Sequence, residues 1–269
     1  MDKEFDKVTA KRNLWIFVVG VLVISTLGGV IMASGYMIGA LLMVLGPAGM
    51  ASILRQFGGD GWKDAELGLN WKASRKWFLF ALLAYPLTQI IILVFGSLSG
   101  LLTIDVGAVR LVTIAAAGLA IQLPIRMIAA FGEEWGWRGY MEPRLEALGV
   151  PDIPRHLTVG IVWALWHFPL IFATPYTELA LSVFLPLFIL GVLVASVVYG
   201  QMRKRSRTVW TSILMHGAAN TVAFSILGDG TNVIFHNKAV AYFGIESIAI
   251  IGIWTVIGLW LLSKRTPTI

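Results

Sequence analysis

The sequence predicts an all-α membrane protein, a polytopic bundle of about eight transmembrane helices. Of its 269 residues, 57% are hydrophobic and only 13% are charged, whereas soluble domains carry about 45–50% apolar and about 25% charged residues. Apolar runs recur along the chain at roughly the 20-residue length that a membrane-spanning helix needs. Basic residues cluster beside these runs, as they do where charge orients helices in a membrane.

Eight apolar runs define the expected spans and leave no room for a separate soluble domain. The runs are Leu14–Ala33, Met37–Leu54, Trp77–Gly96, Ala108–Phe131, Leu157–Phe172, Leu181–Gly200, Thr208–Leu227 and Val240–Leu262. The first run is longer than the roughly 7–15-residue apolar core of a signal peptide, and a second run follows at once, so we expect the first to be retained as a helix. We therefore predict one integral membrane domain over residues 1–269.

The distribution of Lys and Arg predicts how the bundle lies in the membrane. With the N-terminus in the cytoplasm, eight spans place 17 of the 21 basic residues on the cytoplasmic side and only Arg110 and Lys238 outside. Cytoplasmic loops carry such an excess of positive charge, so we expect both termini in the cytoplasm. Segment 56–76 becomes a cytoplasmic connection with a short interfacial helix anchored by its tryptophans, and segment 132–149 is expected to be helical.

Composition excludes several classes of function. The chain has no cysteine, which removes disulfides, thiolate metal sites and a cysteine nucleophile. Its net charge is +6, but nucleic-acid binding needs a basic face interleaved with polar and aromatic groups, and the sequence shows no such face. The expected environment is the lipid bilayer, with no nucleic-acid partner.

The first group of polar residues in the apolar runs is a pair of glutamates followed by an arginine. An ionisable side chain near the bilayer centre costs roughly 2.5–3.5 kcal/mol on insertion scales, so such residues usually mark function. Glu134 and Arg138 are i,i+4 neighbours that can pair on one helix face. Glu133 points about 100° away and is left free to act on water or a ligand. A juxtamembrane helix with solvated charges is the alternative interpretation.

The second and third groups place histidines on two further helices. His167 is the one ionisable residue in the fifth run. His216 and Asn220 are i,i+4 neighbours on one face, and residues 217–219 between them are small enough for close helix approach. Each residue could instead be a packing residue with an interhelical hydrogen bond. His156 and His236 lie near the ends of spans, and we expect both to be solvated.

The combination of these groups predicts hydrolysis. Glu133, His167, His216 and Asn220 come from three separate helices. Together they supply a general base, a proton shuttle and hydrogen-bond donors for an oxyanion. Such a set can hydrolyse an amide by activating water, and it needs no serine or cysteine nucleophile.

The three groups resemble the signature of the CPBP family, which comprises CAAX prenyl endopeptidases and Abi-type bacteriocin-processing or immunity proteins. The family pattern is Glu-Glu-x-x-x-Arg, then Phe-x-x-x-His, then His-x-x-x-Asn. The chain matches the first motif at 133–138 and the third at 216–220, and it has Trp163 in place of phenylalanine in the second. The resemblance covers roughly residues 67–224.

This resemblance implies an eight-helix intramembrane peptidase whose catalytic chamber opens to the cytoplasmic side. By position in the motifs, Glu133 would activate water with assistance from His167. His216 and Asn220 would bind the oxyanion. The substrate would be a membrane-anchored protein or peptide cleaved near its C-terminus or in a transmembrane segment.

The resemblance also assigns Glu134 and Arg138 to shaping the site, and it leaves a metal cofactor open. Two histidines and a glutamate could hold zinc, but the sequence lacks the His-Glu-x-x-His helix of zincins. A metal-free glutamate mechanism therefore stands beside a metal-assisted one.

Two other functions are compatible with the sequence. A non-catalytic membrane immunity or scaffold protein could retain the same fold. A transporter could use the buried glutamate and histidines as a proton relay, although paired broken helices in repeated halves, typical of transporters, are not evident.

Overall fold

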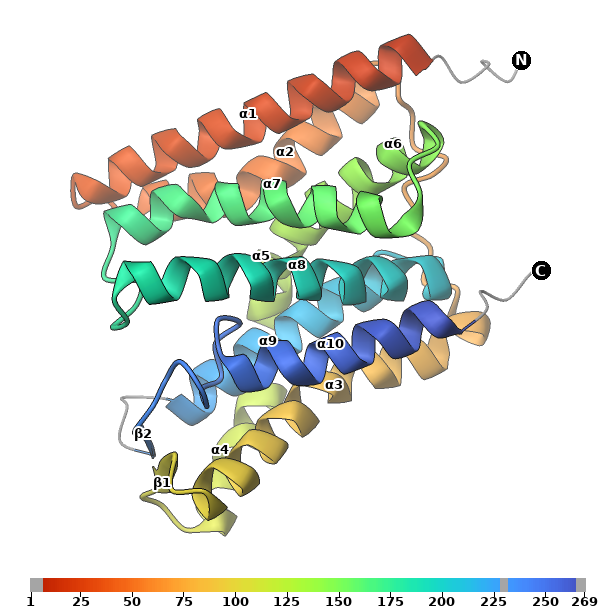
Figure 1. The fold of residues 1–269 in the computed structure, drawn as a ribbon. Helices are drawn as coiled ribbons and strands as arrows, with labels where there is room; N and C mark the ends of the chain where they lie inside the picture. Colours follow the sequence, from red (N-terminus) through yellow and green to blue (C-terminus); the bar gives the residue numbers. More distant parts are fainter. Residues whose placement is uncertain (1–6, 228–231, 265–269) are drawn as a thin grey trace.

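The computed structural model describes residues 7–227 and 232–264, and these form a helical bundle with a two-stranded ladder at one end (Figure 1). The helices are α1 (Lys7–Ala33), α2 (Ile38–Phe57), α3 (Trp71–Leu98), α4 (Ala108–Ile121), α5 (Leu123–Gly136), α6 (Glu142–Ala147), α7 (Asp152–Ala173), α8 (Leu181–Ser206), α9 (Trp210–Leu227) and α10 (Ile248–Ser263). A π-helical turn, η1 (Trp137–Met141), joins α5 to α6. Strands β1 (Leu102–Ile104) and β2 (Val233–Phe235) pair antiparallel. The predicted all-α class is confirmed.

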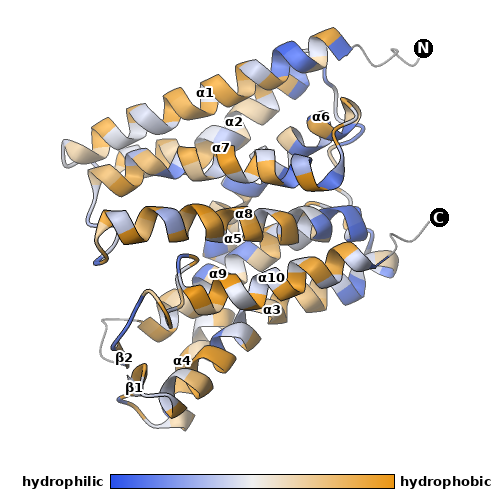
Figure 2. Ribbon diagram, in the orientation of Figure 1, coloured by the Kyte–Doolittle hydropathy of each residue, from blue (hydrophilic) through white to orange (hydrophobic). Residues whose placement is uncertain are grey.

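The bundle has two ends, which we call the terminal end and the loop end. At the terminal end α1 begins, α10 finishes, and segment 58–70 connects α2 to α3 (Figure 1). The loop end holds both strands, segment 174–180 between α7 and α8, and segment 236–247 before α10. Hydrophilic residues gather at the terminal ends of α1, α7 and α8 (Figure 2).

Five of the described helices are long and apolar enough to cross a membrane: α1, α2, α3, α7 and α8. The bent pair formed by α4 and residues 123–147 adds a sixth if it counts as one span. In the described residues α10 is an apolar helix of only 16 residues, and α9 carries the polar side chains of the third motif. The structure thus supports an integral membrane protein, while the number of eight spans stays a prediction.

Two expected spans differ from the helices that form. The run Ala108–Phe131 was expected to be one helix, but it divides into α4 and α5, which meet at Gln122 with a bend of 61°. Pro124 lies in the first turn of α5, where its missing N–H is tolerated. The last run was expected to begin at Val240, but its helix begins at Ile248; the preceding residues form a loop.

The expected interfacial helix in segment 56–76 is also wrong. Residues 58–70 contain no helix, and α3 begins at Trp71, six residues before the expected start at Trp77. Asn70 and Glu66 have positive φ values of 46° and 50°, a left-handed conformation that interrupts helices.

Close packing of α5 on α2 positions the first motif. A Cβ atom on Gly132 would collide with the backbone of Val44, and one on Gly136 would collide with Pro47. Small residues of this kind let membrane helices approach closely. The two glycines therefore fix the depth at which the intervening glutamates enter the bundle.

Candidate active site

The glutamate pair lies at the end of α5, immediately before the π-helical turn. Glu133 is 8% exposed and Glu134 is fully buried. Single π-turns are frequent at functional sites because they redirect side chains within a helix. This turn contains Arg138, which reaches back to the glutamates.

Arg138 pairs with Glu134, as the i,i+4 spacing predicts. The two side chains are fully buried, with Nη1 of Arg138 3.0 Å from Oε2 of Glu134. The guanidinium lies over the rings of Trp163 and Tyr199, with its carbon 4.7 and 4.9 Å from their centroids. Its Nη2 donates to Ser196 at 3.2 Å. The positive charge is thus compensated by a carboxylate, two aromatic faces and a hydroxyl.

His216 joins the two glutamates from α9. Its Nδ1–H donates to Oε1 of Glu134 at 2.9 Å, so Glu134 fixes the orientation of the ring. Its Nε2 lies 3.9 Å from Oε1 of Glu133. A histidine held at one nitrogen by a carboxylate presents the other nitrogen in a defined direction. That direction is toward Glu133.

Glu133 has a partner that the sequence did not reveal. The indole N–H of Trp163, from α7, donates to its Oε2 at 2.9 Å, so the expectation of a carboxylate without a partner is only partly right. In the second motif Trp163 stands in place of phenylalanine. The available signal was chemical, because a buried indole N–H usually finds an acceptor, which phenylalanine cannot offer.

His167 lies one turn beyond Trp163 on α7. Its Nδ1–H donates to the backbone carbonyl of Trp163 at 2.9 Å, which leaves Nε2 available. The ring packs edge-on against Trp166 and Phe188, at centroid distances of 4.7 and 5.3 Å. Aromatic contacts on two sides thus hold the imidazole in place.

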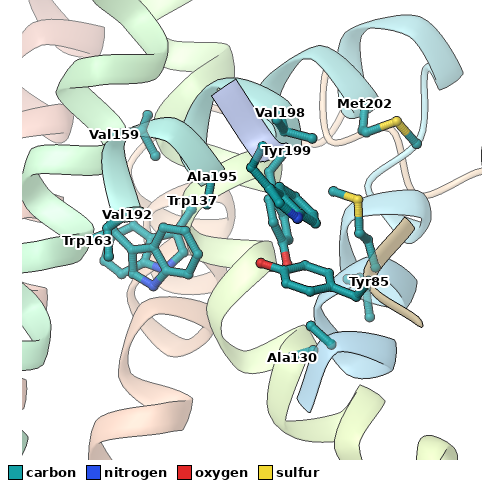
Figure 3. Packing of buried hydrophobic residues seen from close by; sticks show 14 of the residues in the cluster. Tyr85, Ala130, Trp137, Val159, Trp163, Val192, Ala195, Val198, Tyr199 and Met202 are labelled. Carbon is teal, nitrogen blue, oxygen red and sulfur yellow. The ribbon is translucent and has the colours of Figure 1, made fainter. Parts of the chain in front are cut away.

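A cavity of about 410 Å³ joins the second and third motifs. Trp163, His167, His216 and Asn220 all line it, so the face shared by His216 and Asn220 is turned into the cavity. Glu133 borders this space through its contacts with Trp163 and His216. The structure therefore brings all four residues predicted to be catalytic into one region. Figure 3 shows the packed layer beside it, where the hydroxyls of Tyr85 and Tyr199 point toward each other.

The cavity reaches the loop end of the bundle. Its lining there includes Tyr176 of segment 174–180, and Tyr242 and Glu246 of segment 236–247. If the termini are cytoplasmic, as the basic residues predict, this end faces away from the cytoplasm. The resemblance implies a chamber that opens toward the cytoplasm; this opening and the cytoplasmic termini both stay predictions.

His156 and His236 have different environments. His156 was expected to be solvated, which is wrong: it is fully buried, with Nδ1 2.9 Å from Oε1 of Glu142 and Nε2 3.0 Å from Gln201. Packing of α6 against α7 removes it from solvent. His236 is exposed, as expected, and contacts Thr103.

The described residues do not form a site suited to zinc. No group of three or more His, Asp or Glu side chains among residues 7–227 and 232–264 is arranged to hold a metal, whereas zinc sites use three or four protein ligands. The Nδ1 atoms of both motif histidines are already bonded, His216 to Glu134 and His167 to a carbonyl. We derive no catalytic step through a metal.

The comparison with known families agrees with this geometry. Residues 115–222 match the family described as type II CAAX prenyl endopeptidase Rce1-like. This match supports a CPBP-family intramembrane peptidase, that is, a CAAX-type intramembrane protease in general terms. The matched segment runs from within α4 to α9 and contains all three motifs. No curated protein matches the chain.

Proposed function

We propose that the chain is an endopeptidase that hydrolyses a peptide bond of a membrane-anchored protein or peptide with water activated by Glu133. The observation that carries the proposal is that the Glu133 carboxylate lies 3.9 Å from Nε2 of His216, a residue that lines the cavity. A water molecule that reaches both groups can be deprotonated by one and oriented by the other.

Glu133 is suited to the role of general base. The hydrogen bond from Trp163 fixes one carboxylate oxygen at 2.9 Å and leaves the other directed at His216. In the reaction, the water attacks the carbonyl carbon as Glu133 accepts its proton. The nitrogen of the departing amine then receives that proton. His167, with Nε2 available, assists the transfer.

His216, as an imidazolium between the carboxylates of Glu133 and Glu134, and Asn220 are suited to stabilise the oxyanion, because the doubly protonated ring also donates from Nε2. Donors that are already oriented stabilise developing charge without further reorganisation. Glu134 orients His216, and the buried guanidinium of Arg138 compensates the charge of Glu134. The Asn220 side chain lies one helical turn away and lines the same cavity. Glu134 and Arg138 thus act as positioning residues.

The experiment is cleavage of lipid-anchored peptides by the purified protein in nanodiscs, with products identified by mass spectrometry. We expect the wild type to cleave and Glu133→Gln to lose cleavage by about 10²–10⁴-fold, the range of general-base catalysis. Glu178→Gln is the matched control, because Glu178 is an exposed glutamate paired with Lys238. Addition of a chelator should leave the wild-type rate unchanged.

Three results contradict this proposal. Cleavage by Glu133→Gln at the wild-type rate would remove Glu133 from the chemistry. Loss of activity with chelator, restored by added zinc, would replace the metal-free mechanism. A folded wild type that binds the peptides without cleaving any of them would favour the non-catalytic scaffold function.

A further inference from the structure

A buried carboxylate at the loop end of the cavity has no role in the proposed chemistry. Glu246 is 9% exposed and lines the cavity together with Tyr176 and Tyr242. It lies in the segment before α10, outside the membrane-spanning helices. Among the described residues it forms no ion pair, and the hydrogen bond to its carboxyl comes from its own backbone N–H.

The charge of Lys238 acts on Glu246, but the two side chains form no ion pair. Lys238 is engaged by Glu178, with Nζ 2.7 Å from Oε2. Arg126 lies over Phe224, its guanidinium carbon 4.4 Å from the ring centroid. No lysine or arginine occurs among the described residues that line the cavity. Burial raises the pKa of the Glu246 carboxyl.

An unpaired buried carboxylate is costly, and a ligand that carries a positive charge removes that cost. The walls beside Glu246 suit such a ligand, since tyrosine rings attract ammonium and guanidinium groups. Tyr176 and Tyr242 supply these rings from two different connections, segments 174–180 and 236–247. One face of the Tyr242 ring already has a cation near it, because Nζ of Lys238 lies 5.5 Å from the ring centroid. Three side chains that bind cations therefore surround one accessible space.

We propose that Glu246, Tyr176 and Tyr242 form a subsite for a cationic side chain of the substrate, a lysine or arginine a few residues from the scissile bond. This inference rests on the proposed peptidase function and adds substrate specificity to it. The peptide reaches Glu133 from the loop end, with its basic residue held at the entrance. A substrate that places a free carboxylate in this subsite is repelled.

The absence of cysteine in the chain gives a test that needs no known substrate. Ala223 lines the cavity, and Ala223→Cys introduces a single thiol there. Each reaction rate is divided by the rate of the same reagent with a free thiol in solution. After this correction we expect a trimethylammonium-ethyl thiosulfonate to react with the Cys introduced at Ala223 about ten-fold faster than the sulfonate-ethyl reagent of similar size, the order of a charge-assisted contact. Glu246→Gln should reduce the ratio to about two-fold, while Glu146→Gln, which changes an exposed glutamate of α6 at the terminal end, should leave it unchanged.

A second measurement uses binding to the Glu133→Gln background, which separates recognition from cleavage. The probes are palmitoylated peptides that differ at one scanned position, with lysine, glutamine or glutamate. The lysine peptide should bind about ten-fold more tightly than the glutamate peptide at one position, and Glu246→Lys should reverse that order.

The outcomes distinguish the two proposals. Equal reaction rates for both thiol reagents, or a preference for lysine that persists in Glu246→Gln, overturns the subsite. Preference for the lysine peptide without cleavage by the wild type leaves the subsite and contradicts the peptidase function. Glu246→Asp retains the charge, so its preference for cations should survive; loss of preference there would also overturn the assignment.

Discussion

The two ends of the bundle differ in whether their buried charged side chains have ion-pair partners. Toward the terminal end, buried charged groups are paired with one another. Toward the loop end, the cavity is lined by polar side chains such as Glu246, which forms no ion pair among the described residues. Trp163 and His216 lie between the two regions, where they contact Glu133 and Glu134.

The terminal region is a connected set of ion pairs. Each pair links segments that are distant in sequence or neighbours on one helix. The pairs are Arg144–Asp60 at 3.1 Å, Arg203–Glu66 at 3.1 Å, Arg155–Asp152 at 2.7 Å, His156–Glu142 at 2.9 Å and Arg138–Glu134 at 3.0 Å. The first motif ends in this region. Its Glu134 is held in place by the ion pair with Arg138.

The difference separates structural charge from functional charge. A buried pair that is broken leaves an uncompensated charge, so its loss appears as instability. A group left without a protein partner beside a cavity is available to a substrate, so its loss appears in catalysis or recognition. Substitutions in the two regions should therefore change different measurements.

The largest effect on stability is expected at Arg138. Arg138→Leu leaves Glu134 buried without its cation, and we expect a loss of about 3–5 kcal/mol in the free energy of unfolding. Thermal unfolding in detergent measures it. Arg138→Leu combined with Glu134→Leu should be less destabilised than Arg138→Leu alone, because no charge remains unpaired. Equal stability of Arg138→Leu and wild type would contradict a structural role for this pair.

Substitution of a residue that lines the cavity should lower catalysis and leave stability nearly unchanged. Asn220→Ala removes a proposed oxyanion donor, and we expect kcat to fall by about 10²–10³-fold with little change in the unfolding midpoint. Steady-state cleavage of the same lipid-anchored peptide provides kcat and KM. A change in KM alone would show that Asn220 binds substrate without stabilising the transition state.

His156 provides a smaller test in the terminal region. His156→Leu removes the contacts to Glu142 and Gln201, and we expect a loss of about 1–3 kcal/mol in stability. The kcat of the folded fraction should stay close to the wild-type value, because His156 does not line the cavity described above. A large fall in kcat without loss of stability would place His156 in the reaction.

The smallest effect is expected at Glu246, and it depends on pH. Burial raises the pKa of this carboxyl in the folded protein, so the folded state binds more protons than the unfolded state and stability falls as pH rises through that range. Glu246→Gln removes this cost. The variant should unfold at a higher temperature than the wild type at pH 8, and the difference should shrink as pH is lowered. A stabilisation that is equal at all pH values would exclude the carboxyl as its cause.

Much of the fold could be predicted, because apolar runs and the i,i+4 spacing are local signals. The pairing of Arg138 with Glu134 and the shared face of His216 and Asn220 follow from helix geometry alone. The break at Gln122 and the late start of α10 do not, since the residues on both sides are equally apolar. Hydropathy cannot distinguish one bent span from two helices.

The partners of the site were harder to predict, because they depend on packing between distant segments. Trp163 donates to Glu133 across 30 positions of sequence, and His156 is buried because α6 folds against it. Glu246 reaches the cavity from a loop that the sequence placed inside a span. Such contacts depend on tertiary structure and leave no periodic pattern in the sequence.

The most direct measurement compares wild type and Glu133→Gln in one preparation, with the cleavage rate and the unfolding midpoint taken from the same sample. Cleavage by Glu133→Gln is expected to fall by about 10²–10⁴-fold, while the unfolding midpoint and the affinity for the peptide stay near the wild-type values. Cleavage retained at the wild-type rate in a folded Glu133→Gln protein would contradict this expectation.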